Sequence, residues 1–477
     1  MKRWAEYRII IEPGEEKGKG VDRSQPMRMK SDFAQKLLAL VLPIASQQFM
    51  SALVSALDAL MLGALSQDAL SAVSLAGQVA FVESLFLAAM TIGLSMFASQ
   101  YWGKGDIPGS ERVFAYTMGP VLAASAAFSA AGLCIPRGLM FLFTDDPVLM
   151  ELGAVYLRTV SASYFLTGIS QTYLCILKNS GKAAKSSVIG CTSVVLNVIL
   201  NAILIFGLLG APRMGVAGAA LATVLARLVE VLWCVWEVAR RGKVKLRARL
   251  IAAHDPALGA KFWRYTAPVL GNEIVWGVGF TMYSVIMGHL GRDAVAANAV
   301  AGVVKDLIAC FCMGLGSGSG ILVGNELGAG RLDAAKEYGG KLCRLAVVCG
   351  AVSGLVLLAL TPAILALTGL SAQANTYLKG MLVICSYYLI GKSVNCTTIS
   401  GIFCAGGDSR FGLRCDAVTM WCVTVPLGFL AAFVLRLPVL AVYFVISLDE
   451  IIKLPAVYRH YKQYQWVKNL TEKENEQ

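Results

Sequence analysis

Residues 58–73 read DALMLGALSQDALSAV, and the residues that mark this stretch return 225 positions further along the chain. At this offset Gly63 matches Gly288 and Asp68 matches Asp293, without a gap in the register. Apolar residues alone could align by chance, but Pro, Gly and Asp that keep one offset over about 60 residues indicate a duplicated unit. The matched pairs are Pro43/Pro268, Gly63/Gly288, Leu65/Leu290, Asp68/Asp293, Ala69/Ala294, Ala72/Ala297, Gly77/Gly302, Gly93/Gly318, Gly103/Gly328 and Gly105/Gly330.

The composition predicts an all-α integral membrane protein. Of the 477 residues, 57% are hydrophobic and 15% are charged, whereas soluble domains average about 25% charged residues. Apolar stretches of about 20 residues recur between short polar segments, which is typical of transmembrane helices. No alternating strand pattern is present, so helices rather than a barrel satisfy the backbone in lipid. We predict twelve helices, near residues 37–63, 70–101, 112–134, 148–178, 186–209, 215–239, 262–290, 294–325, 337–369, 373–403, 411–436 and 438–461.

Basic residues gather in alternate loops and predict the orientation. Nine Lys and Arg lie at or before Lys36 and eight lie in 240–264, whereas the loops on the other side hold little more than one each. The positive-inside rule therefore places both termini in the cytoplasm, with the chain in the cell membrane. We divide the chain into a cytoplasmic amino-terminal extension, an amino lobe, a basic linker, a carboxyl lobe and a cytoplasmic tail, which span 1–36, 37–239, 240–261, 262–461 and 462–477.

Two halves of six helices share one orientation and are related by an axis along the membrane normal. Transporters with such parallel halves bind substrate between them and alternate access by rocking. The sequence offers no catalytic centre, because its 13 cysteines form no CxxC pair and its three histidines suggest no metal cluster. The net charge of +12 follows from topology rather than from nucleic-acid binding. We predict a monomer in the lipid bilayer, neither an enzyme nor a nucleic-acid-binding protein, and no cofactor.

Several stretches together resemble the multidrug and toxic compound extrusion (MATE) family. They are the opening stretch 58–73, ASQYWGKG at 98–105, its counterpart VGNELGAG at 323–330, and GIFCAGGDS at 401–409. The resemblance covers residues 35–465 and rests on the order and spacing of these modest motifs. It implies two six-helix lobes around a V-shaped cavity, and export of chiefly cationic, amphipathic organic compounds or drugs in exchange for H⁺ or Na⁺.

The first predicted helix carries an intramembrane carboxylate on a polar face. Gln47, Ser51, Ser55 and Asp58 follow at steps of four, four and three, which places them on one side of an α-helix. A carboxylate inside a membrane span is costly, so Asp58 should face protein or water and is a functional candidate. The alternative is a charge at a helix end near the interface, because Gly63 follows closely.

The resemblance supplies partners for Asp58. In MATE transporters with a cation site in the amino lobe, the first-helix carboxylate works with polar residues of the fifth helix and a threonine of the sixth. These positions correspond here to Asn197, Asn201 and Thr223, although asparagines in a span could equally hold helices together. One branch of the family has aspartate at the position of Asn201. A neutral amide coordinates but does not titrate, so Asp58 is the predicted switch, and Na⁺ is the only metal ion that we expect at this site.

Other polar residues are candidates for the cavity or for ion pairs. Gln47, Glu83, Glu273 and Lys392 are substrate-cavity candidates, and Glu83 is unmatched in the repeat because its partner is Ile308. In another branch, carboxylates of helices seven and ten form a cation site, but Lys392 lies near the second position and argues against that site here. The carboxyl half also holds a predicted charge network of Asp306, Asp416 and Glu450, either mutually paired with lysines or rearranging during transport.

The sequence therefore predicts a secondary antiporter that exports organic, chiefly cationic compounds by alternating access. The alternative is a lipid-linked oligosaccharide flippase of the related superfamily. An anionic pyrophosphate cargo would favour a cavity lined with several Arg or Lys, whereas an acid-rich cavity would favour the exporter.

Overall fold

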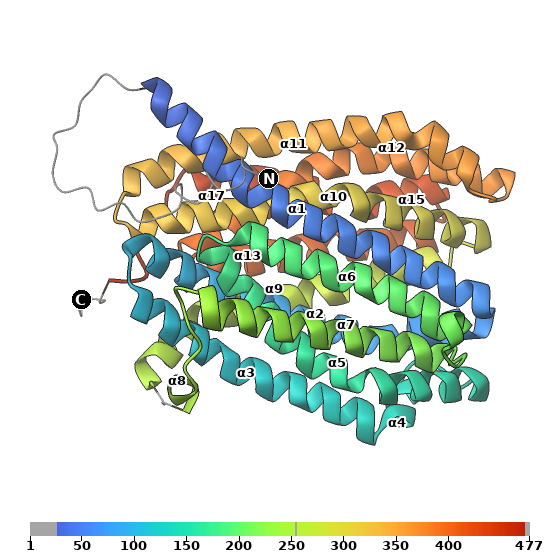
Figure 1. Cartoon of the computed structure of the whole chain (residues 1–477). Coiled ribbons are helices and arrows are strands. Elements are labelled where there is room, and N and C mark those ends of the chain that lie inside the picture. Colours follow the sequence, from blue (N-terminus) through green and yellow to red (C-terminus); the bar gives the residue numbers. More distant parts are fainter. Residues whose placement is uncertain (1–25, 253–254, 473–477) are drawn as a thin grey trace.

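The computed structural model describes residues 26–252 and 255–472, and in this part every regular element is helical (Figure 1). The first half begins with two long helices joined by Ser66, whose hydroxyl caps the second helix by accepting from the Ala69 amide (3.0 Å). A short 3₁₀ turn, Leu208–Gly210, precedes the last long helix of this half. The helices are α1 (Pro26–Leu65), α2 (Gln67–Lys104), α3 (Ile107–Cys134), α4 (Pro136–Phe141), α5 (Pro147–Asn179), α6 (Ala183–Phe206), α7 (Val216–Arg241) and the short α8 (Ala248–Ala252).

The second half has three long helices followed by three interrupted rods. The tenth and eleventh predicted helices pass through π-helical segments, a feature that is frequent at functional sites. The elements are α9 (Pro256–Gly288), α10 (Arg292–Gly328), α11 (Leu332–Leu367), α12 (Ala372–Asn395), η4 (Cys396–Phe403), α13 (Ser409–Asp416), η5 (Ala417–Thr424), α14 (Val425–Phe429), η6 (Leu430–Val434), α15 (Val439–Ile446), α16 (Asp449–Ile452) and α17 (Leu454–Tyr461).

These elements form twelve rods, as predicted. Among the described residues, nine helices are long and apolar enough to cross a membrane. The other three rods are α5, α12 with η4, and α15 to α17, which are richer in polar residues or interrupted. Because lipid offers no hydrogen bonds, a helical backbone at this depth satisfies its own polar groups.

The duplicated sequence unit is also a duplicated structural unit. Helix α2 begins at Gln67 and α10 begins at Arg292, which is the offset of 225 positions seen in the sequence. Each helix is followed by a glycine in the left-handed region, Gly105 with φ 78° and Gly330 with φ 73°. Residues with a Cβ rarely adopt this conformation, so both glycines are explained by the way the helices end.

The structure adds detail at both ends of the described chain. Helix α1 begins at Pro26, so residues 26–36, predicted as part of the amino-terminal extension, are helical and continuous with the first helix, and residues 1–25 lie outside the described part. Phe33 packs on Tyr338 of α11, which gives the early turns of α1 a tertiary partner. Residues 462–472, predicted as a tail, fold back against the bundle, where Trp466 is fully buried.

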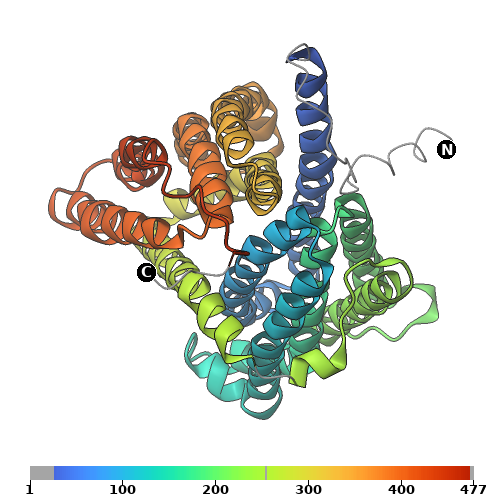
Figure 2. The same ribbon diagram turned by 90° about the vertical axis from the view of Figure 1, so that its left-hand side faces the viewer.

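The two lobes, α1–α7 and α9–α17, meet through the first two helices of each (Figure 2). We call the end of the bundle that holds the α2–α3, α5–α6, α10–α11 and α7–α9 connections the basic end. Near it, α2 and α10 touch backbone to backbone, because a Cβ at Gly103 or Gly328 would overlap Asn325 or Gln100. Towards the opposite end, a Cβ at Gly77 would meet no neighbouring group within 4 Å. The lobes are therefore in close contact near the basic end.

Candidate functional site

The amino lobe brings together the four residues predicted as a coupling site. Asn201 Nδ2 donates to Asp58 Oδ1 at 2.7 Å. With the Asn197 amide oriented to suit its neighbours, its Nδ2 donates to Asp58 Oδ2 (3.2 Å) and its Oδ1 accepts from the Thr223 hydroxyl (3.3 Å). We call Asp58, Asn197, Asn201 and Thr223 the amino-lobe cluster; it connects α1, α6 and α7.

The amino-lobe cluster has the chemistry of a small cation or proton site. Asn201 is 2% exposed and its Oδ1 is a buried acceptor with no hydrogen-bond partner in the described residues. Asp58 makes no ion pair with any described Lys or Arg. Carboxylate and amide oxygens are the donors that hard cations prefer, so this set of atoms fits a cation as well as a proton. Leu62, Ile205 and Ala219, each one helical turn from a member of the amino-lobe cluster, pack together as a hydrophobic cluster beside it.

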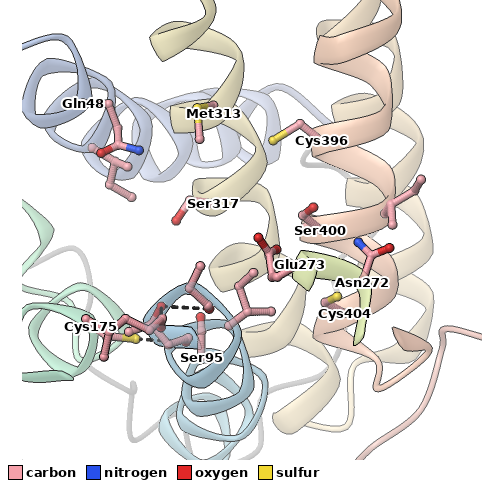
Figure 3. Close-up of a pocket in the computed structure, with 18 of the residues that line it drawn as sticks. Gln48, Ser95, Cys175, Asn272, Glu273, Met313, Ser317, Cys396, Ser400 and Cys404 are labelled. Atoms are coloured by element: carbon pink, nitrogen blue, oxygen red, sulfur yellow. Dashed lines mark hydrogen bonds between the residues drawn. The ribbon is translucent and has the colours of Figure 1, made fainter. Parts of the chain in front are cut away.

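A cavity of about 580 Å³ lies between the lobes. Figure 3 shows Glu273 and Asn272 on the side of the carboxyl lobe, facing Gln48, Ser95 and Cys175 of the amino lobe. This volume is typical of a small-molecule site. Three of the four predicted cavity residues, Gln47, Glu273 and Lys392, line it. Apolar side chains complete the wall, including Ile44, Leu87, Met96, Trp276 and Met313.

Glu83 does not line the cavity, which corrects its predicted position. Its side chain is 3% exposed and accepts a hydrogen bond from the Ser125 hydroxyl of α3 at 2.9 Å. The face of α2 that carries Glu83 also carries Ala76 and Val79, which pack in a core cluster with Leu157 and Tyr164 of α5. Glu83 therefore points into the amino lobe instead of towards the other lobe.

The carboxyl lobe contains a second buried charged cluster. Lys453 Nζ contacts Asp416 Oδ1 (2.6 Å) and Glu450 Oε2 (3.6 Å), and Lys392 Nζ contacts Glu450 Oε1 (3.3 Å). Asn395 Nδ2 donates to Glu450 Oε2 at 2.7 Å. We call Lys392, Asp416, Glu450 and Lys453 the carboxyl-lobe cluster.

One predicted member is missing from that cluster. Asp306 on α10 is exposed and makes none of the ion pairs found among the described residues. Its neighbour Lys305 packs over the rings of Phe280 and Tyr388 at 5.5 and 5.2 Å. The adjacent positions 305 and 306 differ by about 100° around the helix, so they meet different surroundings.

Sequence reasoning did not single out two further charged residues. Asp449 is 2% exposed, lies beside Glu450, and has one carboxylate oxygen without a hydrogen-bond partner among the described residues. Lys178 near the end of α5 lines the cavity. In the sequence, Lys178 contributed only to the count of basic residues near a loop. Its position at the carboxyl end of a predicted helix was the feature that could have indicated a place on the cavity wall.

The cavity wall carries both signs of charge instead of being rich in acids. Its bases are Lys178, Arg227, Lys392 and Lys453, and its acids are Glu273, Asp416 and Glu450. Most of these bases are neutralised locally, since Arg227 contacts Glu230 at 2.8 Å and two lysines belong to the carboxyl-lobe cluster. Paired charges of this kind leave a polar but nearly neutral surface.

The family model MatE matches the chain twice, over residues 43–203 and 268–430. The chain belongs to the MATE family. The two matches begin at Pro43 and Pro268, which are the first matched pair of the internal repeat. Membership in this family of efflux transporters agrees with a helical bundle that holds a cavity between two lobes.

Curated relatives and solved structures agree with this assignment. An uncharacterized transporter YisQ of Bacillus subtilis is 22% identical, with 94% of this chain and 98% of that protein aligned. The multidrug resistance protein NorM of Burkholderia vietnamiensis is 26% identical over 83% of this chain and 86% of its own length. A crystal structure of the Vibrio cholerae MATE transporter VcmN superposes with a TM-score of 0.84 at 17% identity, covering 93% of this chain and 99% of that one. At this identity the structural likeness concerns the fold, which is the twelve-helix, two-lobe MATE architecture.

Proposed function

We propose that this MATE transporter is a secondary antiporter that exports amphipathic organic compounds, organic cations among them, in exchange for H⁺ or Na⁺. The observation that carries the proposal is the amino-lobe cluster, in which Asp58 has two amide partners and, among the residues that the structure describes, no basic one. A carboxylate without a counter-cation is able to take up a cation or a proton and release it again when its surroundings change. A NorM relative carries the name multidrug resistance protein, which supports drug-like substrates.

The cavity supports alternating access. The cavity is lined by both lobes, so a bound compound would touch both lobes. The compound would be released when the lobes separate at the end opposite the basic end. We place the protein in the cell membrane with the basic end in the cytoplasm, because loops rich in Lys and Arg alternate with loops that hold few. We propose that it acts as a monomer.

A lipid-linked oligosaccharide flippase is the second candidate. The observation in its favour is that Lys178, Arg227, Lys392 and Lys453 line the cavity, since several bases suit an anionic pyrophosphate. The carboxylates that neutralise three of these bases weaken that case.

The test is efflux of a fluorescent cationic dye from proteoliposomes, with H⁺ and Na⁺ gradients imposed separately. We expect dye efflux under one gradient and its collapse when a matching ionophore dissipates that gradient, which also identifies the ion. If neither gradient moves dye while a short-chain lipid-linked pyrophosphate is translocated, the flippase replaces the antiporter.

A further inference from the structure

The segment after the last transmembrane rod, residues 462–472, lies at the seam between the lobes at the basic end. We call it the tail. Trp466 is fully buried and stacks on Tyr461, with ring centres 5.5 Å apart. It packs against Gly339 of α11, where a Cβ would lie 2.9 Å from the indole. This end of the tail is thereby fixed to the carboxyl lobe.

The other end of the tail is bound to the amino lobe by hydrogen bonds and also touches the carboxyl lobe. Leu470 is 3% exposed, belongs to the hydrophobic cluster that includes Phe97 of α2 and Phe262 of α9, and lies against Gly407 of the carboxyl lobe. Lys104 Nζ, at the end of α2, donates to the Thr471 carbonyl at 3.3 Å. The side chain of Asn469 accepts from the Thr471 amide at 2.9 Å and holds the chain in a turn.

Gln100 of α2 joins the tail to both lobes. Its side chain is fully buried, and its Nε2 donates to the Ala405 carbonyl (2.7 Å) of the carboxyl lobe and to the Lys468 carbonyl (3.1 Å). Its Oε1 accepts from the Leu470 amide at 2.6 Å. One buried amide therefore uses its donors and its acceptor to connect α2, the segment after η4, and the tail.

These contacts can exist only while the basic end is closed. Gln100 lies beside the place where α2 and α10 touch through Gly328, so separation of the lobes here would carry α2 away from Ala405. The tail would then lose the hydrogen bonds of Gln100 to Leu470 and Lys468, or Trp466 would have to leave the carboxyl lobe. A buried donor or acceptor that loses its partner is costly, which makes the open form less favourable while the tail is in place.

We propose that the tail is a latch that stabilises the conformation closed at the basic end and must release one lobe before that end opens. The proposal rests on the alternating-access cycle proposed above. It assigns to Gln100 and to residues 466–472 control of the balance between the two conformations, without a direct role in binding the coupling ion or the exported compound.

The test is hydrogen–deuterium exchange of the purified chain in lipid nanodiscs, which reports the conformational balance whether or not any compound is transported. The first variant ends after Asn469, so it keeps Trp466 and loses the Leu470 and Lys104 contacts. Its matched control ends after Glu472 and keeps every tail contact described here. The second variant is Gln100→Met, which keeps the tail and side-chain volume but removes three hydrogen bonds.

We expect the amides of 96–105 and 403–408 to exchange at least about tenfold faster in both variants than in the control, because several buried interactions are lost together. Amides of the α1–α2 turn at the opposite end should exchange more slowly, as that end closes. Acceleration at the seam in both variants, with slower exchange at the α1–α2 turn, supports the latch, and acceleration without that slowing would overturn it. Unchanged exchange, or acceleration that spreads through α11 and α12, would overturn it and leave the tail as a general structural support.

Discussion

The two lobes share an ancestor in sequence and a fold, but their buried polar clusters have opposite character. The amino-lobe cluster surrounds one carboxylate, Asp58, with neutral amides and a hydroxyl. The carboxyl-lobe cluster surrounds its carboxylates with two lysines at 2.6 to 3.6 Å. A carboxylate that is already paired with a lysine gains little from another cation, whereas Asp58 makes no ion pair with a Lys or Arg in the described part of the chain. The duplicated lobes thus differ in their buried polar groups, with neutral partners around the carboxylate in one lobe and internal ion pairs in the other.

The largest expected effect comes from removing the carboxylate of Asp58, which makes no ion pair with a described Lys or Arg. Asp58→Asn keeps the volume and the helix but removes the charge that attracts a cation, so gradient-driven dye efflux should fall to the rate of protein-free liposomes. Asp68→Asn, which removes an exposed acid at the start of α2, is the matched control and should transport normally. Efflux that survives Asp58→Asn would move ion coupling to the carboxyl lobe and break the comparison.

The second effect tests whether the carboxyl-lobe cluster is held by its lysines. Lys453→Met leaves Asp416 and Glu450 buried with fewer partners, and such a change typically lowers stability by about 3–5 kcal/mol. Thermal unfolding in detergent should show a clearly lower midpoint. Lys336→Met breaks the exposed pair with Asp333 and should cost less than about 1 kcal/mol. Equal midpoints for the two variants would show that the buried pairs contribute no more than surface ones.

The spacing of residues along single helices predicts which members of the amino-lobe cluster lie on the same face of a helix. Asp58 follows Gln47, Ser51 and Ser55 on one face, and Asn197 and Asn201 are four residues apart, so each helix offers its polar face as a unit. That these faces meet followed from the family resemblance, because spacing along one helix says nothing of its rotation against another. The membrane spans were predictable because runs of about 20 apolar residues are visible in the sequence. The repeat was predictable because identical residues recur at a fixed offset of 225 positions.

What remained unpredicted depends on contacts between elements. Helix α2 is largely apolar on every side, so its sequence did not indicate that Glu83 turns towards α3. The tail is short and largely polar in sequence. Trp466 and Leu470 are buried because the tail folds into the seam between the two lobes, and the sequence of the tail alone does not indicate that contact. In both cases tertiary packing decides which side of a segment is buried.

A smaller effect tests whether the Asn201 amide contributes to ion binding in addition to the Asp58 carboxylate. Asn201→Ala removes the 2.7 Å hydrogen bond to Asp58 and the unpartnered oxygen beside it, and leaves the carboxylate itself in place. The Asn201 Oδ1 is the atom that would coordinate a cation, so half-maximal transport should need about tenfold more Na⁺ if Na⁺ is the coupling ion, whereas loss of the Nδ2 hydrogen bond should not weaken uptake of a proton. Thr192→Ala on the same helix is the control, because among the described residues its hydroxyl bonds only the Val188 carbonyl. An unchanged ion dependence would restrict the site to Asp58 and argue for a proton.

The smallest effect is expected at Asp306, the predicted network member that the structure places outside the carboxyl-lobe cluster. Its side chain is exposed and has no ion-pair partner among the described residues, so Asp306→Asn should change stability by less than about 0.5 kcal/mol. Transport should stay near the wild-type rate. Glu450→Gln is the comparison, since it weakens contacts to both Lys392 and Lys453 and should lower the unfolding midpoint. If Asp306→Asn instead abolishes efflux at normal stability, this carboxylate takes part in transport without an ion-pair partner among the described residues. The carboxyl lobe would then, like the amino lobe, carry an acid that is able to bind a cation.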